Sequence, residues 1–480
     1  MKRILLVFAA LLGAMSLMQA KVELAPIFAD NMVLQQQTDA AIWGKAEPGK
    51  KVVIRPSWSK AKVVVTADAD GKWFARVATP VAGGPYEITF NDGDKVTLKN
   101  VLIGEVWICS GQSNMYQKMM GYSGQPTAGS VDYIVSADPA TPIRSCNLSL
   151  RKSFEPKDVC EATWYENTPE GVSEASATAY FFAVRLYSAL RIPVGIINAS
   201  WGGSPIEAWM SKETLEPFAD ELKMEPLLKK EWPEKNPHKV PSVLYNGMLH
   251  SLVPFTAKGF LWYQGCDNRM RYEQYKRLQP AFVQMLREKW GNDKMPFYFT
   301  QIAPYKYGDP DRPHTGYMMW AQAQTLDLIP YSGMAATHDA GDFANIHPAN
   351  KKAVGDRLAF LALANDYGIK GFDAKAPIAR TFEFKDGMAF VTFEVGKKGL
   401  CPSNTDLEGF ELAGEDMVFY PAKGLVVKNE KGEKNTIQVY QCPQVTKPVA
   451  VRYGMKNWSV ATVFNSSGIP ISPFRSDDWK

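Results

Sequence analysis

The sequence lacks several features that would point to whole classes of protein. It has no internal repeat, no low-complexity tract and no long block of one charge, which argues against a solenoid or a long disordered tail. It also has no C-x-x-C pair and no H-E-x-x-H motif, so neither a zinc ribbon nor a metalloprotease helix is indicated. We therefore expect a chemistry that needs no metal and no other cofactor.

Long hydrophobic runs are absent too, apart from a short one at the start. Lys2 and Arg3 precede an apolar stretch over residues 4–12, and smaller residues follow as far as Ala20. This pattern predicts a secretory signal peptide over residues 1–20, and hence a periplasmic or extracellular protein without membrane insertion. Its removal lowers the formal charge from +4 to +2, which does not favour a nucleic-acid partner.

Cysteine is sparse, with six residues in 480. In an exported protein, disulfides between Cys146 and Cys160 and between Cys401 and Cys442 are the favoured pairs, because each pair lies within one region of the chain. Cys109 is expected to fill a buried strand. The sequence gives no oligomeric state.

The chain is too long for one ordinary hydrophobic core, and its pattern of apolar and polar residues changes twice along the sequence. Residues 21–100 show short alternating runs broken by turn residues, which predicts a small N-terminal β-sandwich domain. Residues 101–370 alternate between apolar runs and helical patterns, as in an α/β domain with a parallel sheet. Residues 371–480 return to alternation and predict a C-terminal β-rich domain.

The α/β segment has recognisable elements. Buried strands are predicted over residues 106–109, 194–199, 259–263, 296–301 and 333–337. Helices are predicted over residues 178–190, 272–290 and 348–367.

Ser113 is the most informative residue of this segment. The apolar run before it stops at Gly111, so the serine hydroxyl is presented two residues after a buried strand. A serine nucleophile is presented in this way, near a helix N-terminus whose free N–H groups stabilise an oxyanion. The second glycine of G-x-S-x-G is missing, which argues against the α/β-hydrolase elbow. A serine that only caps a helix is the alternative.

Three further segments follow other strands of the predicted sheet. Gly202 and Gly203 come after the second strand, Gln264 after the third and His347 after the fifth. Because the carboxyl ends of parallel strands share one edge, these residues are expected to gather around Ser113. His347 is then the predicted general base, while the N–H groups of Ser113 and Gly203 and the Gln264 amide form an oxyanion site. Plain turns or strand-end hydrogen bonds are the structural alternatives, and His338 is a weaker alternative base.

At this point the sequence resembles a known family. The segments over residues 107–115, 200–209, 244–248, 262–265, 346–351 and 409–414 are similar to those of the sialate O-acetylesterase family of SGNH hydrolases. The resemblance implies a flavodoxin-like three-layer core and removal of O-acetyl groups from sugars. It also implies that Ser113 is the nucleophile, that His347 is the base, and that Gly203 and Gln264 join the Ser113 N–H in the oxyanion site.

Two positions depart from the family pattern. Asn345 stands where an acidic residue commonly precedes the histidine, and Cys266 stands where glutamate commonly follows Gln-Gly. Asn345 is the expected third member of the catalytic group, through its carbonyl, with Asp342 or Asp339 as substitutes. A serine-histidine dyad and a nucleophilic role for Cys266 are further alternatives.

The expected substrate is an O-acetylated sugar or glycan. Trp201 and Tyr263 are candidates for sugar contacts, and Arg269 or Arg271 for the carboxylate of a sialic acid. Three rival functions stay open. They are an acetylxylan esterase, a lipid esterase, and a carbohydrate-binding protein that lost turnover through the changes at Asn345 and Cys266.

Overall fold

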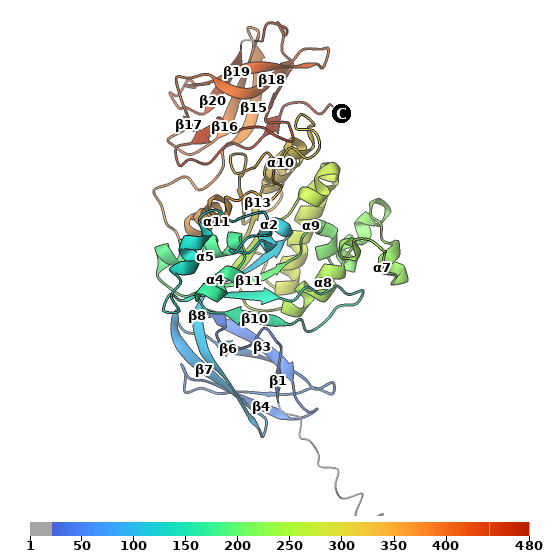
Figure 1. Cartoon of the computed structure of the whole chain (residues 1–480), viewed down its shortest axis with the longest axis vertical. Coiled ribbons are helices and arrows are strands. Elements are labelled where there is room, and N and C mark those ends of the chain that lie inside the picture. The colour runs from blue at the N-terminus through green and yellow to red at the C-terminus, as the bar shows by residue number, and fades with distance from the viewer. Residues whose placement is uncertain (1–21, 441, 480) are drawn as a thin grey trace, which may run out of the picture.

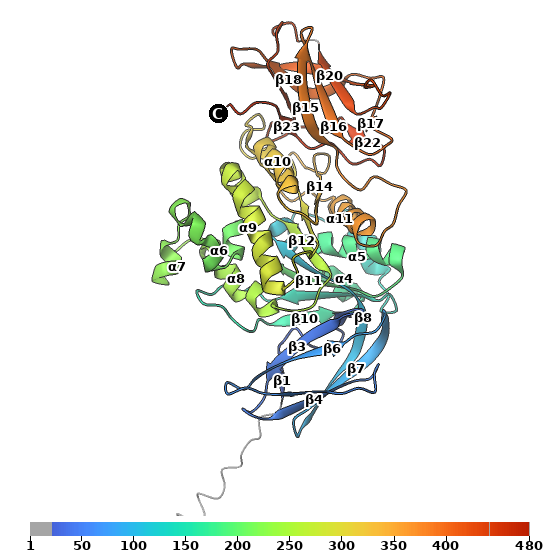
Figure 2. The same ribbon diagram turned by 180° about the vertical axis from the view of Figure 1, so that it is seen from behind.

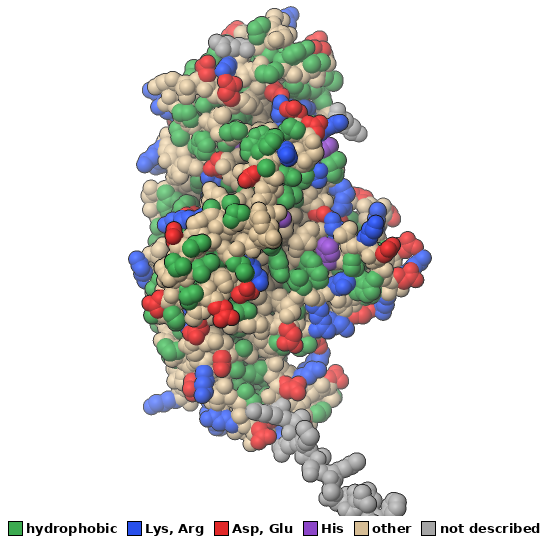
Figure 3. Space-filling view, in the orientation of Figure 1, with side chains coloured by type: hydrophobic (Ala, Val, Ile, Leu, Met, Phe, Trp, Pro, Cys, Tyr) green, Lys and Arg blue, Asp and Glu red, His purple; other side chains and the backbone are tan. Residues whose placement is uncertain are grey.

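The computed structural model describes residues 22–440 and 442–479. The predicted signal peptide lies outside these described residues. The molecule is elongated, with a β-rich part at one end, an α/β part in the middle and a second β-rich part at the other end (Figures 1 and 2). Its face in Figure 3 carries basic and acidic side chains interspersed, in keeping with the small net charge.

The first β-rich part consists of two sheets. Its strands are β1 (Glu23–Leu24), β2 (Val33–Gln35), β3 (Asp39–Lys45), β4 (Lys51–Pro56), β5 (Val63–Thr66), β6 (Lys72–Ala78) and β7 (Gly83–Asn91). One sheet has the order β1-β3-β6, while β4, β5 and β7 join the start of β8 (Lys95–Gly111). Side chains of β6 alternate between exposed and buried, as the sequence predicted. The domain boundary predicted at residue 100 falls inside β8, which runs on into the middle of the molecule.

The middle part holds a parallel sheet. Besides β8 it contains β9 (Ile143–Leu148), β10 (Ala162–Tyr165), β11 (Val194–Ser200), β12 (Gly259–Tyr263), β13 (Phe297–Thr300) and β14 (Ser332–Ala335). The order is β10-β9-β11-β8-β12-β13-β14, and β10 alone among these runs antiparallel to its neighbour. The five predicted strands are confirmed, whereas β9 and β10 were not predicted.

Helices cover both faces of this sheet. The α-helices are α2 (Ser113–Tyr116), α3 (Ser130–Val135), α4 (Pro169–Glu174), α5 (Ala177–Leu190), α6 (Lys212–Leu215), α7 (Glu225–Lys229), α8 (Val243–Gly247), α9 (Tyr272–Trp290), α10 (His314–Gln324) and α11 (Lys351–Asn365). The 3-10 helices are η1 (Ile206–Trp209), η2 (Glu216–Glu221), η3 (Pro237–Lys239), η4 (Leu249–Leu252), η5 (Cys266–Arg271) and η6 (Thr325–Asp327). Side chains of α5 and α11 share one core cluster with Trp107, and those of α9 belong to another with Trp262.

The helix predicted from Pro348 begins later, at Lys351. Asn350 caps it, because its side-chain oxygen accepts a hydrogen bond from the N–H of Ala353 at 3.2 Å. Proline therefore lies before the cap and not in the first turn. Residues 348–350 thus separate His347 from the helix.

The C-terminal part is built on a seven-stranded antiparallel sheet. Its strands are β15 (Ile378–Lys385), β16 (Met388–Glu394), β18 (Leu407–Ala413), β19 (Phe419–Val427), β20 (Thr436–Tyr440), β21 (Ala450–Tyr453) and β23 (Phe474–Arg475), with β17 (Leu400–Cys401) and β22 (Phe464–Asn465) as a separate pair. His338 is buried against Tyr453 and bonds Ser459 at 2.7 Å. The weaker alternative base is thus part of the contact with this end of the molecule.

The favoured disulfides were wrong. All six cysteines are free thiols in the described structure. Cys401 directs its sulfur at the carbonyl of Asn465, and Cys442 at that of Tyr420. Cys146 and Cys160 are both buried, and Cys160 bonds the carbonyl of Ser149. Sharing a region of the chain did not bring the sulfurs into bonding geometry.

Two features are absent from residues 22–440 and 442–479. None of their helices is long and apolar enough to cross a membrane. No group of three or more His, Cys, Asp and Glu side chains is found there in an arrangement that could hold a metal ion.

Candidate active site

The central strands β8, β11 and β12 end at the same position along the sheet. Gly111 at the end of β8 lies opposite Ser200 of β11 on one side and Tyr263 of β12 on the other. The segments that follow, with Ser113, Gly202, Gly203 and Gln264, therefore leave the sheet at one edge. The sequence predicted this gathering from strand order alone.

The turn that carries Ser113 is held by both neighbouring strands. Gly111 has a φ of +137°, and a Cβ there would lie 2.2 Å from the carbonyl oxygen of Tyr263, so only glycine fits. The Gln112 N–H donates to that carbonyl, and the Gln112 side chain accepts from the Gly265 N–H at 3.0 Å. Ser113 is partly exposed at the start of α2. A serine hydroxyl on a rigid turn is therefore open to a substrate.

The loop with His347 lies against this turn. The Asn114 amide donates to the carbonyl of Ile346 at 3.1 Å. Lys351 then bridges the two segments, because its ammonium donates to the Asn114 side-chain oxygen and to the Pro348 carbonyl, both at 2.7 Å. Two residues that are 234 positions apart in numbering, 113 and 347, thus belong to adjoining segments. Within the described residues, neither the Ser113 hydroxyl nor His347 Nε2 has a hydrogen-bond partner.

Two side chains of the segment after α2 surround the imidazole. Gln125 Oε1 lies 2.5 Å from His347 Nδ1. The Tyr122 ring meets the imidazole edge-on at 5.3 Å between centroids, and its hydroxyl donates to the Ser113 carbonyl at 3.0 Å. Neither residue was predicted. Gly124 marks a turn in this segment, but no local signal says that the turn faces a residue 222 positions away.

Burial and the nearby Lys351 ammonium lower the pKa of His347 to about 4. This value lies well below the ordinary 6.5 of an imidazole. An imidazole with this pKa is neutral over the whole mildly acidic range.

The expected third member and its two substitutes make their hydrogen bonds and ion pairs elsewhere in the structure. The Asn345 side-chain oxygen accepts from the backbone N–H of His347 at 2.8 Å and does not contact the ring. Asp342 accepts from the N–H groups of Ala344 and Asn345. Asp339 forms a two-pronged ion pair with Arg357 at 2.6 Å. These oxygens are engaged by local turns or by arginine.

The predicted oxyanion donors divide into two groups. The backbone N–H groups of Ser113, Gly202 and Gly203 have no hydrogen-bond partner among the described residues, and all three residues are partly exposed. Gly202 is close to the serine, because a Cβ there would lie 3.6 Å from the Ser113 Cβ. The expectation for Gln264 was wrong. Its buried amide nitrogen donates to the Ser204 carbonyl and to Asn268 Oδ1, at 3.1 and 2.7 Å.

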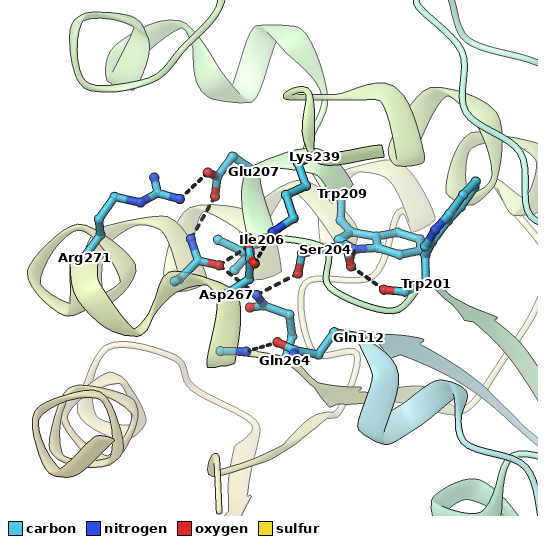
Figure 4. A network of polar contacts seen from close by, with 12 residues as sticks. Gln112, Trp201, Ser204, Ile206, Glu207, Trp209, Lys239, Gln264, Asp267 and Arg271 are labelled. Atoms are coloured by element: carbon cyan, nitrogen blue, oxygen red, sulfur yellow. Dashed lines mark hydrogen bonds and ion pairs between the residues drawn. The ribbon is translucent and has the colours of Figure 1, made fainter. Parts of the chain in front are cut away.

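Gln264 belongs instead to a polar network that joins the segments after β11 and β12 (Figure 4). The Asn268 amide nitrogen donates a hydrogen bond to the Glu207 carboxylate at 2.9 Å, and Glu207 forms an ion pair with Arg271 at 2.6 Å. Lys239 and Asp267 form an ion pair next to it at 2.5 Å. The network fixes the segments that follow β11 and β12 relative to each other. Arg271, a candidate for a substrate carboxylate, is already paired.

The three predicted sugar-contacting residues differ in access. Tyr263 is buried in the core, so its predicted contact is wrong. Trp201 is partly exposed and stacks on His238, with ring planes 4° apart. Arg269 is partly exposed, and its guanidinium lies 3.7 Å from the Tyr307 ring centroid. Within the described structure Arg269 has no ion pair, and its buried Nε has no hydrogen-bond partner.

Cys266 is a poor nucleophile in this arrangement. Burial raises the pKa of its thiol to about 11, so the reactive thiolate is scarce at neutral pH. The sequence alternative that made Cys266 a nucleophile is therefore not supported by its surroundings.

Comparisons with known proteins identify the family of this chain. Residues 103–363 match the family of carbohydrate esterases described as sialic acid-specific acetylesterases. The chain belongs to this family. The sialate O-acetylesterase of Homo sapiens is 28% identical over 93% of this chain and 90% of its own, and that of Mus musculus is 26% identical over 93% of both. A crystal structure of a carbohydrate acetylesterase from Xanthomonas citri is 30% identical, with a TM-score of 0.85 over 96% of this chain and all of that one.

The family resemblance read from the sequence is thus confirmed. The esterase is a carboxylic-ester hydrolase with a mixed α/β fold of several sheets, similar to that of the Xanthomonas citri protein. The matched segment begins in β8 and ends in α11, so it contains both the serine turn and the histidine loop.

Proposed function

We propose that this esterase removes acetyl groups from O-acetylated sugars through an acetyl-serine intermediate, with Ser113 as nucleophile and His347 as general base. The observation that carries the proposal is the junction of the two segments. Asn114, next to the serine, bonds both Ile346 and Lys351, on either side of the histidine. The family match and the acetylesterase relatives support the acetyl ester as substrate.

In the proposed first half-reaction, the Ser113 oxygen attacks the acetyl carbonyl carbon while its proton passes to His347 Nε2. The carbonyl oxygen becomes negative and is stabilised by the N–H groups of Ser113 and Gly203. When the ester bond breaks, the sugar oxygen leaves and takes the proton from the imidazolium. Water repeats the sequence on acetyl-Ser113, which yields acetate and free enzyme.

The proposed substrate contacts are made by Trp201 and Arg269. Trp201 offers a partly exposed ring at the edge of the glycine turn, and Arg269 is a cation without a carboxylate partner among the described residues. A sialic acid brings a carboxylate that such a guanidinium binds well. Acetylated xylan, the second candidate substrate, has an uncharged backbone and gains nothing from Arg269.

The finer architecture is also a proposal. We infer a three-layer SGNH hydrolase core of flavodoxin-like type over about residues 101–370, flanked by β-rich domains over 21–100 and 371–480. The parallel sheet with helices on both faces supports this division. The signal-peptide pattern of residues 1–20 supports export to the periplasm or the extracellular space.

The test is hydrolysis of a chromogenic acetyl ester by the purified protein and by Ser113→Ala and His347→Ala. Each variant is expected to lose at least about 10³-fold in kcat. Ser123→Ala is the matched control, because Ser123 is an exposed serine in the segment that follows α2. Equal rates for wild type and Ser113→Ala would favour the carbohydrate-binding alternative. A preference for octanoyl over acetyl esters would favour a lipid esterase.

A further inference from the structure

Among the described residues, the imidazole of His347 has one hydrogen-bond partner, and it is an amide. Gln125 Oε1 lies 2.5 Å from Nδ1. An amide oxygen can only accept, so Nδ1 carries the proton and donates it. The neutral ring then has its lone pair on Nε2, which is the nitrogen that can take a proton from a nucleophile.

Gln125 is held in place by its own loop. Its N–H and carbonyl each bond Tyr122, both at 2.9 Å, and close a tight hairpin through Gly124, whose φ is +69°. The Gln117 amide donates to the Gln125 carbonyl at 3.3 Å. Further along, the Ala128 N–H donates to the carbonyl of Ala349 at 2.9 Å, two residues after the histidine.

The same hairpin also touches the nucleophile. Tyr122 packs its ring against the imidazole and donates its hydroxyl to the Ser113 carbonyl. The hairpin therefore contacts the serine, the histidine and the segment beyond the histidine. An element with these three contacts fixes the ring orientation as well as its tautomer.

The carboxylates and the amide on the histidine's own loop do not take this role. Asn345, Asp342 and Asp339 are engaged elsewhere, as described above. We infer that Gln125 is the positioning residue of His347, a neutral side chain that replaces the acid of a serine-histidine-acid group and reaches the ring from the opposite loop. This inference rests on the proposed roles of Ser113 and His347.

A neutral partner has a chemical consequence. The amide oxygen fixes the ring through a hydrogen bond but contributes no negative charge to the imidazolium that forms during the reaction. Among the described residues, the charged and titratable groups found next to the ring are Lys351 from α11 and Tyr122 from the hairpin. Lys351 opposes protonation, so the ring is a base that works without a carboxylate.

The experiment compares Gln125→Ala and Gln125→Glu with wild type on an acetyl ester, with kcat, KM and the full pH profile measured for each. Gln125→Ala is expected to lose about 10²-fold in kcat with little change in KM. Gln125→Glu is expected to keep most of the wild-type kcat and to move the acid limb of the profile upward by at least one pH unit, because a carboxylate stabilises the imidazolium. Ser123→Ala, in the same hairpin, is the control.

Two results would overturn the inference. One is wild-type kcat and an unchanged profile in Gln125→Ala. The other is loss of activity in Gln125→Glu with an acid limb that does not move, which is the pattern of a merely structural residue. Failure of the proposed function looks different, because Ser113→Ala would then be as active as wild type.

Discussion

Lys351 is a buried lysine whose removal should change how stability depends on pH. It is 1% exposed, and its ammonium bonds only neutral oxygens, those of Asn114 and Pro348, among the described residues. Burial lowers its pKa from 10.5 to about 7. The difference of 3.5 pH units corresponds to about 5 kcal/mol of cost for holding the charged form in the folded state.

The sign follows from proton binding. Between pH 7 and 10.5 the unfolded chain holds a proton on Lys351 that the folded chain has released, so stability rises with pH in this window. At lower pH both states are protonated and the full cost is present. In Lys351→Met this site cannot titrate, so the free energy of unfolding of wild type should gain about 2 kcal/mol relative to the variant between pH 7 and pH 9.

Urea denaturation of both proteins at pH 6, 7, 8 and 9 measures this difference. Lys352→Met is the matched control, because Lys352 is more exposed and already pairs with Asp356 at 2.5 Å. The free energy of unfolding of Lys352→Met should change with pH in the same way as that of wild type. If the free energy of unfolding of Lys351→Met also follows wild type at every pH, Lys351 keeps its charge in the folded state and the reasoning is wrong.

Three other predictions follow from the site. With the His347 pKa at about 4, kcat/KM should stay level from pH 7 down to about pH 5 and fall as the base is protonated near pH 4; a midpoint near 6.5 would contradict this assignment. Arg269→Ala should raise KM for O-acetylated sialic acid about 10-fold and leave an acetylated neutral sugar unaffected, as parallel product analysis would show; equal effects on both would remove Arg269 from carboxylate binding. Gly111→Ala should lower the free energy of unfolding by roughly 3–5 kcal/mol, because the added Cβ overlaps the Tyr263 carbonyl. Gly129→Ala is the control, since Gly129 has φ +68° and open space around it, and should cost about 1–2 kcal/mol. Similar losses in the two variants would contradict the clash.

Much of the fold was predictable because the central strands are buried on both faces. Such strands appear as apolar runs, and their order along the chain predicts that Ser113, Gly203 and His347 lie at one edge of the sheet. The strand β9 was missed because its sequence, Ile-Arg-Ser-Cys-Asn-Leu, is as polar as a loop. Arg144 within it is buried against Glu166, which only tertiary structure reveals.

The parts of the site that were mispredicted are those set by side-chain direction. Gln264 lies at the predicted edge, yet its amide points into the network with Ser204 and Asn268. Asn345 lies beside the histidine in sequence, but its short side chain reaches the nearest backbone N–H instead of the ring. Gln125 approaches from another loop, and nothing in its local sequence predicts a contact over 222 positions.

The most direct measurement of the central claim is to inactivate the esterase with a serine-reactive phosphonate and locate the adduct by peptide mass spectrometry. The account predicts one adduct, on Ser113, formed in step with the loss of acetyl ester hydrolysis and formed far more slowly in His347→Ala. An adduct on another residue, or full inactivation with Ser113 unmodified, would contradict it.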